Sequence, residues 1–225
     1  MRVLNQIELF LDGSYPKEDQ KAFIFKSRCL CNYLERALNQ IRFETTLSRI
    51  NIHCLKDAAE VRVQQLKDVP YLEVGLKYDL PSVSELDEFA LQEHYIKIID
   101  LGLKAAEDFM PVPYSYCMDI IQEFIKGGYK NEWVQDNKSW KKGGIHSIVL
   151  AELTMGKFFL TQSVYRDDDL VARKIIAEAM PREMLFLDYL GQLSMDRTGN
   201  IIYKRKRNVL SKFSLETNAF IDLDD

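Results

Sequence analysis

The sequence has no long apolar run, and this absence excludes several classes of protein at once. No stretch approaches the roughly 18 to 20 apolar residues that a bilayer-spanning helix needs. The first residues, MRVLNQIELFLDG, contain no run long enough for the apolar part of a secretory signal. We therefore expect a soluble, cytoplasmic protein that has no membrane partner.

Cysteine is scarce, with four residues in a chain of 225, and the four are scattered. Cys29 and Cys31 are two positions apart, while Cys54 and Cys117 stand alone. Because no C-x-x-C pair exists, neither a zinc clamp nor a redox motif is indicated. We expect four reduced and mostly buried thiols.

Motifs for catalysis and cofactor binding are also missing. Gly127-Gly128 and Gly143-Gly144 lack the spacing of a phosphate-binding loop, and no serine stands in a G-x-S-x-G elbow. The three histidines form no metal-binding pair, so we expect no metal and no cofactor. The densest acidic run, Asp167 to Asp169, is interpreted as a turn whose last residue caps a helix, rather than as a cation site.

The histidines have ordinary structural interpretations. His53 falls on the polar face of a predicted strand, and His94 falls on the apolar side of a predicted helix. His146 shares a strand face with Glu152, six residues further on. These two would form an acid–base pair only if other groups converged on them.

Positive charge is not in excess, since 30 basic residues stand against 34 acidic ones and the net charge is −4. A nucleic-acid-binding protein needs a basic surface to displace phosphate counterions, so a nucleic-acid partner is not expected. The only basic run, Lys204 to Arg207, is interpreted as a solvated strand end. An acidic chain is compatible with a basic protein partner.

Hydrophobic periodicity predicts the α+β class, with mixed and antiparallel sheets. In the first half of the chain, segments whose apolar residues recur every second position alternate with segments that have the helical period of about 3.6 residues. We predict a strand within 3–11, a long N-terminal helix over 17–43, strands over 49–55, 60–66 and 71–79, an acidic helix over 81–110 and a helix over 114–126.

The second half of the chain is predicted to be antiparallel and β-rich. The pattern places strands over 145–154, 157–166, 184–194 and 200–206 and one within 209–223. Residues 169–180 fit either a short helix or a strand over 173–179, and we favour the helix. The chain fits a single α+β domain, residues 1–225, which could be subdivided into 1–126 and 145–225 joined by the loop 127–144.

The central acidic helix is the most informative stretch. Ser82 and Glu85 have the spacing of a capping box, and Pro111 and Pro113 end the helix. Seven acidic residues stand against two lysines in this stretch, and the unpaired charge concentrates in the first turns. The acids that we select as candidate partner-binding residues are Glu85, Asp87, Glu88, Glu93 and Glu107.

Large aromatic residues follow the acidic helix and are interleaved with lysines. Such residues anchor protein interfaces, although packing on the core is an equally good interpretation for most of these rings. We select Tyr129, Trp133 and Trp140 as candidate partner-binding aromatics.

In the acids of residues 85–108 and the aromatics of residues 114–140, the chain resembles the immunity proteins of bacterial toxin systems. The resemblance is one of class, to acidic α+β proteins of this size that carry no active-site motif. It implies a stoichiometric inhibitor that binds a basic toxin domain and covers the active site of the toxin.

We therefore expect a non-catalytic protein-binding module, an immunity-type inhibitor of a cognate bacterial toxin. The first alternative is a nucleic-acid- or nucleotide-processing enzyme that uses Asp167 to Asp169, His146 and the basic strand near Lys204. The second alternative is an adaptor subunit of a larger assembly.

Overall fold

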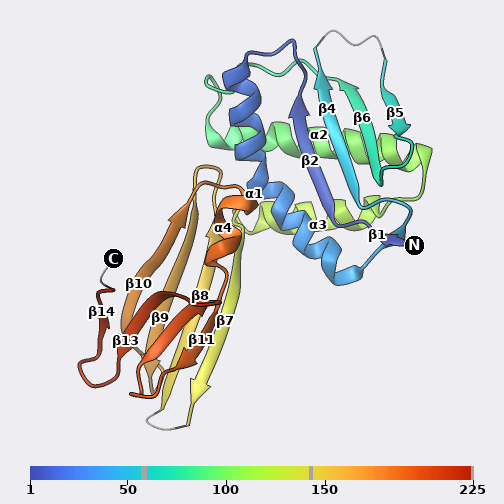
Figure 1. Cartoon of the computed structure of the whole chain (residues 1–225). Helices are drawn as coiled ribbons and strands as arrows, with labels where there is room; N and C mark the ends of the chain where they lie inside the picture. The colour runs from blue at the N-terminus through green and yellow to red at the C-terminus, as the bar shows by residue number, and fades with distance from the viewer. Residues whose placement is uncertain (57–59, 142–143, 224–225) are drawn as a thin grey trace. The chain divides into compact units, whose positions relative to one another are not determined.

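The chain divides into two compact units in the computed structural model, which describes residues 1–56, 60–141 and 144–223 (Figure 1). Unit 1 is Met1–Asn131 and contains the three long helices. Unit 2 is Glu132–Asp225 and consists mostly of antiparallel strands. The predicted α+β class, with mixed and antiparallel sheets, is confirmed.

Unit 1 is built on a four-stranded mixed sheet. Its strands lie in the order β2 (Gln6–Leu11), β4 (Arg49–Leu55), β6 (Tyr71–Lys77) and β5 (Arg62–Gln65). The first three are parallel, and β5 is antiparallel to β6. A short pair, β1 (Arg2–Val3) and β3 (Glu44–Thr45), lies outside this sheet. Because side chains alternate along a strand, every second residue, such as Leu9, Ile52 and Val74, enters the core.

Two helices pack on that apolar face, and a third packs against those two. The three are α1 (Lys17–Ile41), α2 (Glu88–Phe109) and α3 (Tyr114–Lys126). In Figure 1, α2 passes behind the strands of the sheet. A Cβ atom added to Gly102 of α2 would lie only 2.5 Å from the side chain of Ile52, so a glycine is needed for this close helix–sheet approach. The Tyr95 hydroxyl of α2 donates to the backbone oxygen of Phe23 in α1, at 3.1 Å.

Helix α1 also protects the free edge of the sheet. The carboxylate of Glu35 accepts a hydrogen bond from the backbone N–H of Ile7 at 3.1 Å, and Arg28 donates to the Ile7 carbonyl at 3.4 Å. Arg28 and Glu35 are themselves paired at 2.6 Å and buried. This ion pair therefore takes the place of a neighbouring strand along β2, where unpaired backbone groups would otherwise be exposed.

The start of α2 differs from the predicted capping box. The helix begins at Glu88, and its N-cap is Asp87, whose carboxylate accepts from the N–H of Ala90 at 2.8 Å. Ser82 and Glu85 lie in a preceding turn, where the N–H of Glu85 donates to the Ser82 carbonyl. The Ser82 hydroxyl donates instead to Asp19, so this serine fixes the turn to α1 rather than capping α2.

Unit 2 is a sandwich of two antiparallel sheets. One sheet has the order β10 (Asp169–Ala179), β9 (Phe158–Arg166), β8 (Ile145–Leu153) and β7 (Glu132–Trp140). The other has the order β11 (Gln192–Met195), β12 (Ile201–Arg205), β13 (Asn208–Ser214) and β14 (Ala219–Ile221). Val149 and Leu160 of the first sheet share one buried cluster with Tyr203 and Phe213 of the second.

Three sequence predictions in this region are wrong. The predicted loop 127–144 contains β7, which pairs with β8 along its length. Residues 169–180 form the strand β10 and not a helix, because Asp167 and Asp168 adopt positive φ angles of 47° and 71° and make a two-residue hairpin turn. The first part of the predicted strand 184–194 is helical, as α4 (Glu183–Phe186) and a 3₁₀ turn (Leu187–Tyr189).

No helix in the described part of the chain is long and apolar enough to cross a membrane.

Candidate functional site

The start of α2, the turn that precedes it and Tyr129, which lies three residues after the end of α3, form an acidic and aromatic surface on unit 1. We call this surface the α2 patch and define it as Glu85, Asp87, Glu88, Phe89, Glu93 and Tyr129. Phe89 is 62% exposed, and its ring meets the ring of Tyr129 edge-on at 5.4 Å between centroids. The Tyr129 hydroxyl donates to Glu93 at 2.5 Å. Two of the predicted site residues, 36 positions apart in the chain, are therefore brought into contact.

The backbone holds Tyr129 in this place. Helix α3 ends at Gly127 and Gly128, and the N–H of Tyr129 bonds back to the Phe124 carbonyl at 2.9 Å. Tyr129 has a φ of 61°, in the left-handed region that bulky residues rarely adopt. Its ring also lies edge-on against Phe124 at 5.7 Å, so the surface aromatic is continuous with the core of unit 1.

The acids of the α2 patch are exposed and carry uncompensated charge. Within the described ranges, no lysine, arginine or histidine makes an ion pair with Glu85, Asp87, Glu88 or Glu93. The hydrogen bond to Glu93 raises the pKa of Tyr129 to about 12, so the tyrosine stays a neutral donor at physiological pH. The carboxylate charge of Glu93 is thus oriented without being neutralised.

The other predicted acid, Glu107, lies away from the α2 patch. It is exposed, but 14 residues separate it from Glu93 on the same helix. At 1.5 Å per residue this is a distance of about 21 Å along the helix axis. The structure therefore does not gather all the acids of α2 at one place.

Trp133 and Trp140 belong to β7 of unit 2 and are partly buried. Both pack against the buried cluster of the sandwich, and the ring of Trp133 lies 6.1 Å from that of Phe158. Most of their surface is thus already used within unit 2.

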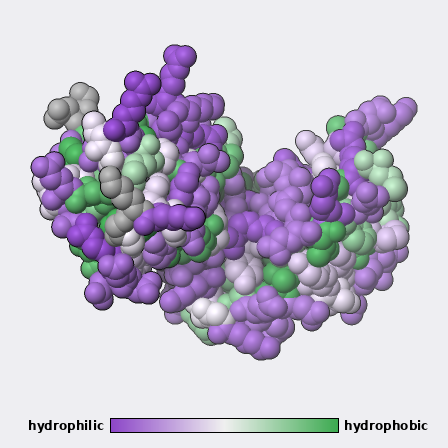
Figure 2. Space-filling view, turned by 90° about the horizontal axis from the view of Figure 1, so that it is seen from below, coloured by the Kyte–Doolittle hydropathy of each residue, from purple (hydrophilic) through white to green (hydrophobic). Residues whose placement is uncertain are grey.

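Most of the face drawn in Figure 2 is hydrophilic, with hydrophobic residues in small groups among the polar ones. Exposed single hydrophobic residues are common on such surfaces. The α2 patch differs because its exposed phenylalanine has an ordered aromatic neighbour and several unpaired carboxylates beside it. Aromatic anchors with charged surroundings are typical of protein interfaces.

Sequence reasoning missed a polar network on the face of the unit 1 sheet opposite the core. Parallel sheets are usually covered on both faces, but here Glu8, Asn51 and Glu73 lie side by side on neighbouring strands of the face opposite the core. His53 pairs with Glu73 at 2.6 Å, and Asn51 donates to the same carboxylate at 2.8 Å. The alternating polar residues of 49–53 were the signal, but their partners depend on strand order, which the sequence does not state.

This network is largely satisfied internally. Arg49 donates to Gln6 at 2.7 Å and to Glu8 at 3.3 Å, and its guanidinium lies over the ring of Tyr71. The Oδ1 atom of Asn51 is buried and has no hydrogen-bond partner among the described residues. These side chains link neighbouring strands of the sheet, and the Asn51 Oδ1 atom is the acceptor that they leave unused.

The remaining candidates for chemistry are dispersed. His94 accepts from or donates to the Tyr78 hydroxyl at 2.8 Å in unit 1. His146 stacks on Tyr165 in unit 2, and six residues of extended strand, about 20 Å, separate it from Glu152. Asp169 starts a strand rather than capping a helix. Lys204 and Arg205 end β12, followed by a turn at Lys206 and Arg207, as the solvated strand-end interpretation requires.

Among the residues that the structure describes, no three histidine, cysteine, aspartate or glutamate side chains are grouped as metal ligands. No family model matches the chain, and neither a curated protein nor a solved structure matches it. The fold and the site define an α+β protein of two units that presents an acidic, aromatic patch on the first.

Proposed function

We propose that this chain is a non-catalytic, cytoplasmic protein-binding protein, an immunity-type inhibitor that neutralises a cognate bacterial toxin by direct binding. One observation carries the proposal. The exposed ring of Phe89 stands beside Tyr129 and Glu93, among carboxylates that have no basic partner in the described residues. Such a surface has the composition of an interface whose partner is basic.

The α2 patch suits both steps of association. Unpaired carboxylates at the helix start attract a basic surface over several ångströms and accelerate the encounter, with a dependence on salt. Phe89 then supplies the apolar anchor, because it loses 62% of its surface from water when a partner covers it. A toxin whose active-site groove is basic would accept these carboxylates in place of an anionic substrate.

The enzyme alternative has weaker support. The turn that contains Asp167 lies near the start of β8, since the Asp167 N–H donates to the Gly144 carbonyl at 3.0 Å. The ring of His146 stacks on Tyr165, however, and within the described residues no hydrogen bond or ion pair joins it to Asp167, Asp168 or Asp169. The adaptor alternative shares the binding surface and differs in the consequence of binding. An adaptor would bind without inhibiting its partner.

Co-expression tests the proposal. The chain is produced together with the product of the gene beside its own, and toxicity to the host and co-purification are both measured. We expect the neighbouring product to arrest growth, the chain to relieve the arrest, and the two proteins to co-purify in equal amounts. Phe89→Ala should weaken the protection. A neighbouring product that is harmless, or that binds without being inhibited, would contradict the immunity-type function.

A further inference from the structure

The outer face of the β10-β9-β8-β7 sheet in unit 2 carries exposed apolar side chains. Val134, Leu170 and Ile175 are 57%, 54% and 56% exposed, and they lie on the face opposite the buried cluster. The register places Val134, Leu150, Thr161 and Ile175 directly beside one another on the four strands. We call this row the apolar strip.

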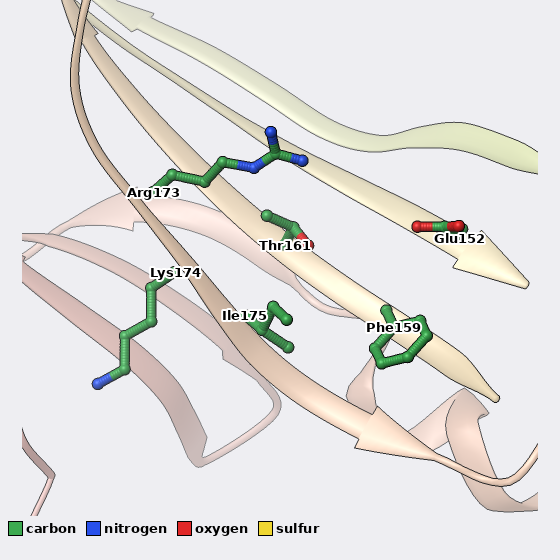
Figure 3. Close-up of a pocket in the computed structure, with 6 residues that line it drawn as sticks. All are labelled: Glu152, Phe159, Thr161, Arg173, Lys174 and Ile175. Atoms are coloured by element: carbon green, nitrogen blue, oxygen red, sulfur yellow. The ribbon is translucent and has the colours of Figure 1, made fainter.

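Charged residues of opposite sign flank the apolar strip. Towards one end of the strands lies Arg173, two residues before Ile175 on β10. Towards the other end lie Glu152 and Glu178, which the register aligns on either side of Phe159. A hollow of about 460 Å³ between these groups is lined by Glu152, Phe159, Thr161, Arg173, Lys174 and Ile175 (Figure 3).

Two of the flanking charges are available to a partner. Arg173 and Glu152 make no ion pair within the described residues, and Figure 3 shows the Arg173 side chain extending over the sheet towards β8. The neighbouring Lys174 points the other way and pairs with Asp222 at 3.3 Å. Glu178 is already paired with Lys157.

We propose that this face is the interface of a homodimer, in which the same face of a second copy packs on it. A twofold axis that runs along the apolar strip superimposes each strip on its counterpart. The same axis reverses the direction of the strands, so Arg173 of each copy comes over the Glu152 and Glu178 row of the other. The face is therefore complementary to itself in both apolarity and charge, as a twofold interface requires.

The dimensions predict a weak dimer. Four strands about 4.8 Å apart and four rows of side chains about 6.7 Å apart give a contact of roughly 500 Å² per copy. Two such faces bury about 1,000 Å², which is at the low end for specific protein interfaces. Sheets that pack face to face at about 10 Å with their strands nearly aligned accommodate this contact.

Analytical ultracentrifugation of the full chain tests the proposal, over concentrations from low micromolar to near millimolar. We expect a reversible monomer–dimer equilibrium. Ile175→Glu should abolish it, and Arg173→Glu should raise the dissociation constant at least tenfold. The matched control is Arg207→Glu, the same charge reversal at an exposed residue in the turn after β12 of the other sheet, and it should leave the constant unchanged.

Charge exchange supplies the second measurement. Arg173→Glu combined with Glu152→Arg should restore association relative to either single reversal, because each copy again presents one base and one acid. Circular dichroism confirms that each variant is folded. A chain that stays monomeric throughout, or a dimer that responds equally to reversal at 173 and at 207, would overturn the inference. The result is independent of the α2 patch, which lies on unit 1.

Discussion

At the scale of single residues, burial decides the chemistry of the thiols. Cys54 is fully buried on β4, and burial raises its pKa to about 12, with the nearby Asp12 carboxylate as a smaller cause. Burial likewise raises the pKa of Cys117 to about 12. The reactive thiolate form is thus almost absent at pH 8.

We expect the folded chain to react negligibly with a thiol reagent such as 5,5′-dithiobis(2-nitrobenzoate) at pH 8. After unfolding in urea, all four cysteines, which are free in the structure, should react. The absorbance of the released chromophore gives the number of reacted thiols in the folded and in the unfolded chain. Rapid modification of one or more thiols in the native protein would show that the core of unit 1 opens readily.

His94 gives unit 1 a dependence on acid. Burial, and then the positive charge of Lys97, lower its pKa below the ordinary 6.5. The unfolded chain therefore takes up a proton at a higher pH than the folded chain does. The contribution of neutral His94 to the free energy of unfolding is complete above about pH 6.5. It decreases as the pH falls towards the pKa of His94 in the folded state.

We expect the free energy of unfolding to decrease when the pH is lowered from 7 to 5, and His94→Gln to flatten this decrease. Urea titrations followed by circular dichroism at 222 nm report on unit 1, since its three helices dominate the helical signal. If the free energy of unfolding decreased equally with pH in the original chain and in His94→Gln, the effect would belong to other groups.

At the scale of elements, the contact of α2 with the sheet limits what position 102 tolerates. Alanine favours a helix over glycine by about 1 kcal/mol. Its Cβ would, however, lie 2.5 to 2.9 Å from three atoms of Ile52, and overpacking costs about 1 to 3 kcal/mol.

Gly102→Ala should therefore destabilise the chain by about 1 kcal/mol net, in spite of the better helix former. In an Ile52→Ala background, where the three contacting atoms are absent, the same change should cost nothing or stabilise. Urea denaturation of the original chain, the two single variants and the double variant gives the coupling free energy between positions 52 and 102. Additive effects would mean that α2 does not approach β4 as closely as described.

The N-cap of α2 is a second element-scale test. Asp87→Ala removes the acceptor of the Ala90 N–H and should cost about 1 kcal/mol, whereas Asp87→Asn retains a capping oxygen and should cost less. Glu85→Ala, the control, removes an exposed acid that does not cap the helix. Loss of stability at Glu85 equal to that at Asp87 would favour the capping box over the observed cap.

The elements also show where sequence reasoning succeeds and where it fails. The patterns of 49–55, 114–126 and 145–154 predicted β4, α3 and β8, because the first alternates, the second is amphipathic with a helical period and the third is a continuous β-rich apolar run. β10 was mistaken for a helix because its two bulges, after Leu170 and after Ile175, disturb the alternation of apolar residues. β7 was mistaken for a loop because its polar, half-exposed residues are stabilised by pairing with β8 rather than by their own pattern.

The same distinction applies to the site. Glu93 and Tyr129 were predicted individually, from charge and from aromatic character. Their contact, and the part played by Phe89, depend on the turn that returns the chain after α3 to the start of α2. The network of His53 with Glu73 needs the parallel pairing of β4 with β6, two strands that are separated by β5 in the chain.

At the scale of the whole molecule, the two units present surfaces of different character. Unit 1 carries the α2 patch, in which charge dominates and one aromatic ring is the anchor. Unit 2 carries the apolar strip, in which apolar residues dominate and charges flank them. The two surfaces share no residue. Binding of a partner at the α2 patch and self-association at the apolar strip therefore do not compete for the same side chains.

The most direct test of the proposed function measures the affinity of the purified chain for the product of the neighbouring gene by titration calorimetry. Glu88→Lys combined with Glu93→Lys should weaken binding at least tenfold and reduce its dependence on salt. Glu107→Lys, an identical reversal about 21 Å along the same helix from Glu93, should leave the affinity unchanged. An affinity unaffected by the double reversal, or lowered equally by Glu107→Lys, would contradict the assignment of the α2 patch as the binding surface.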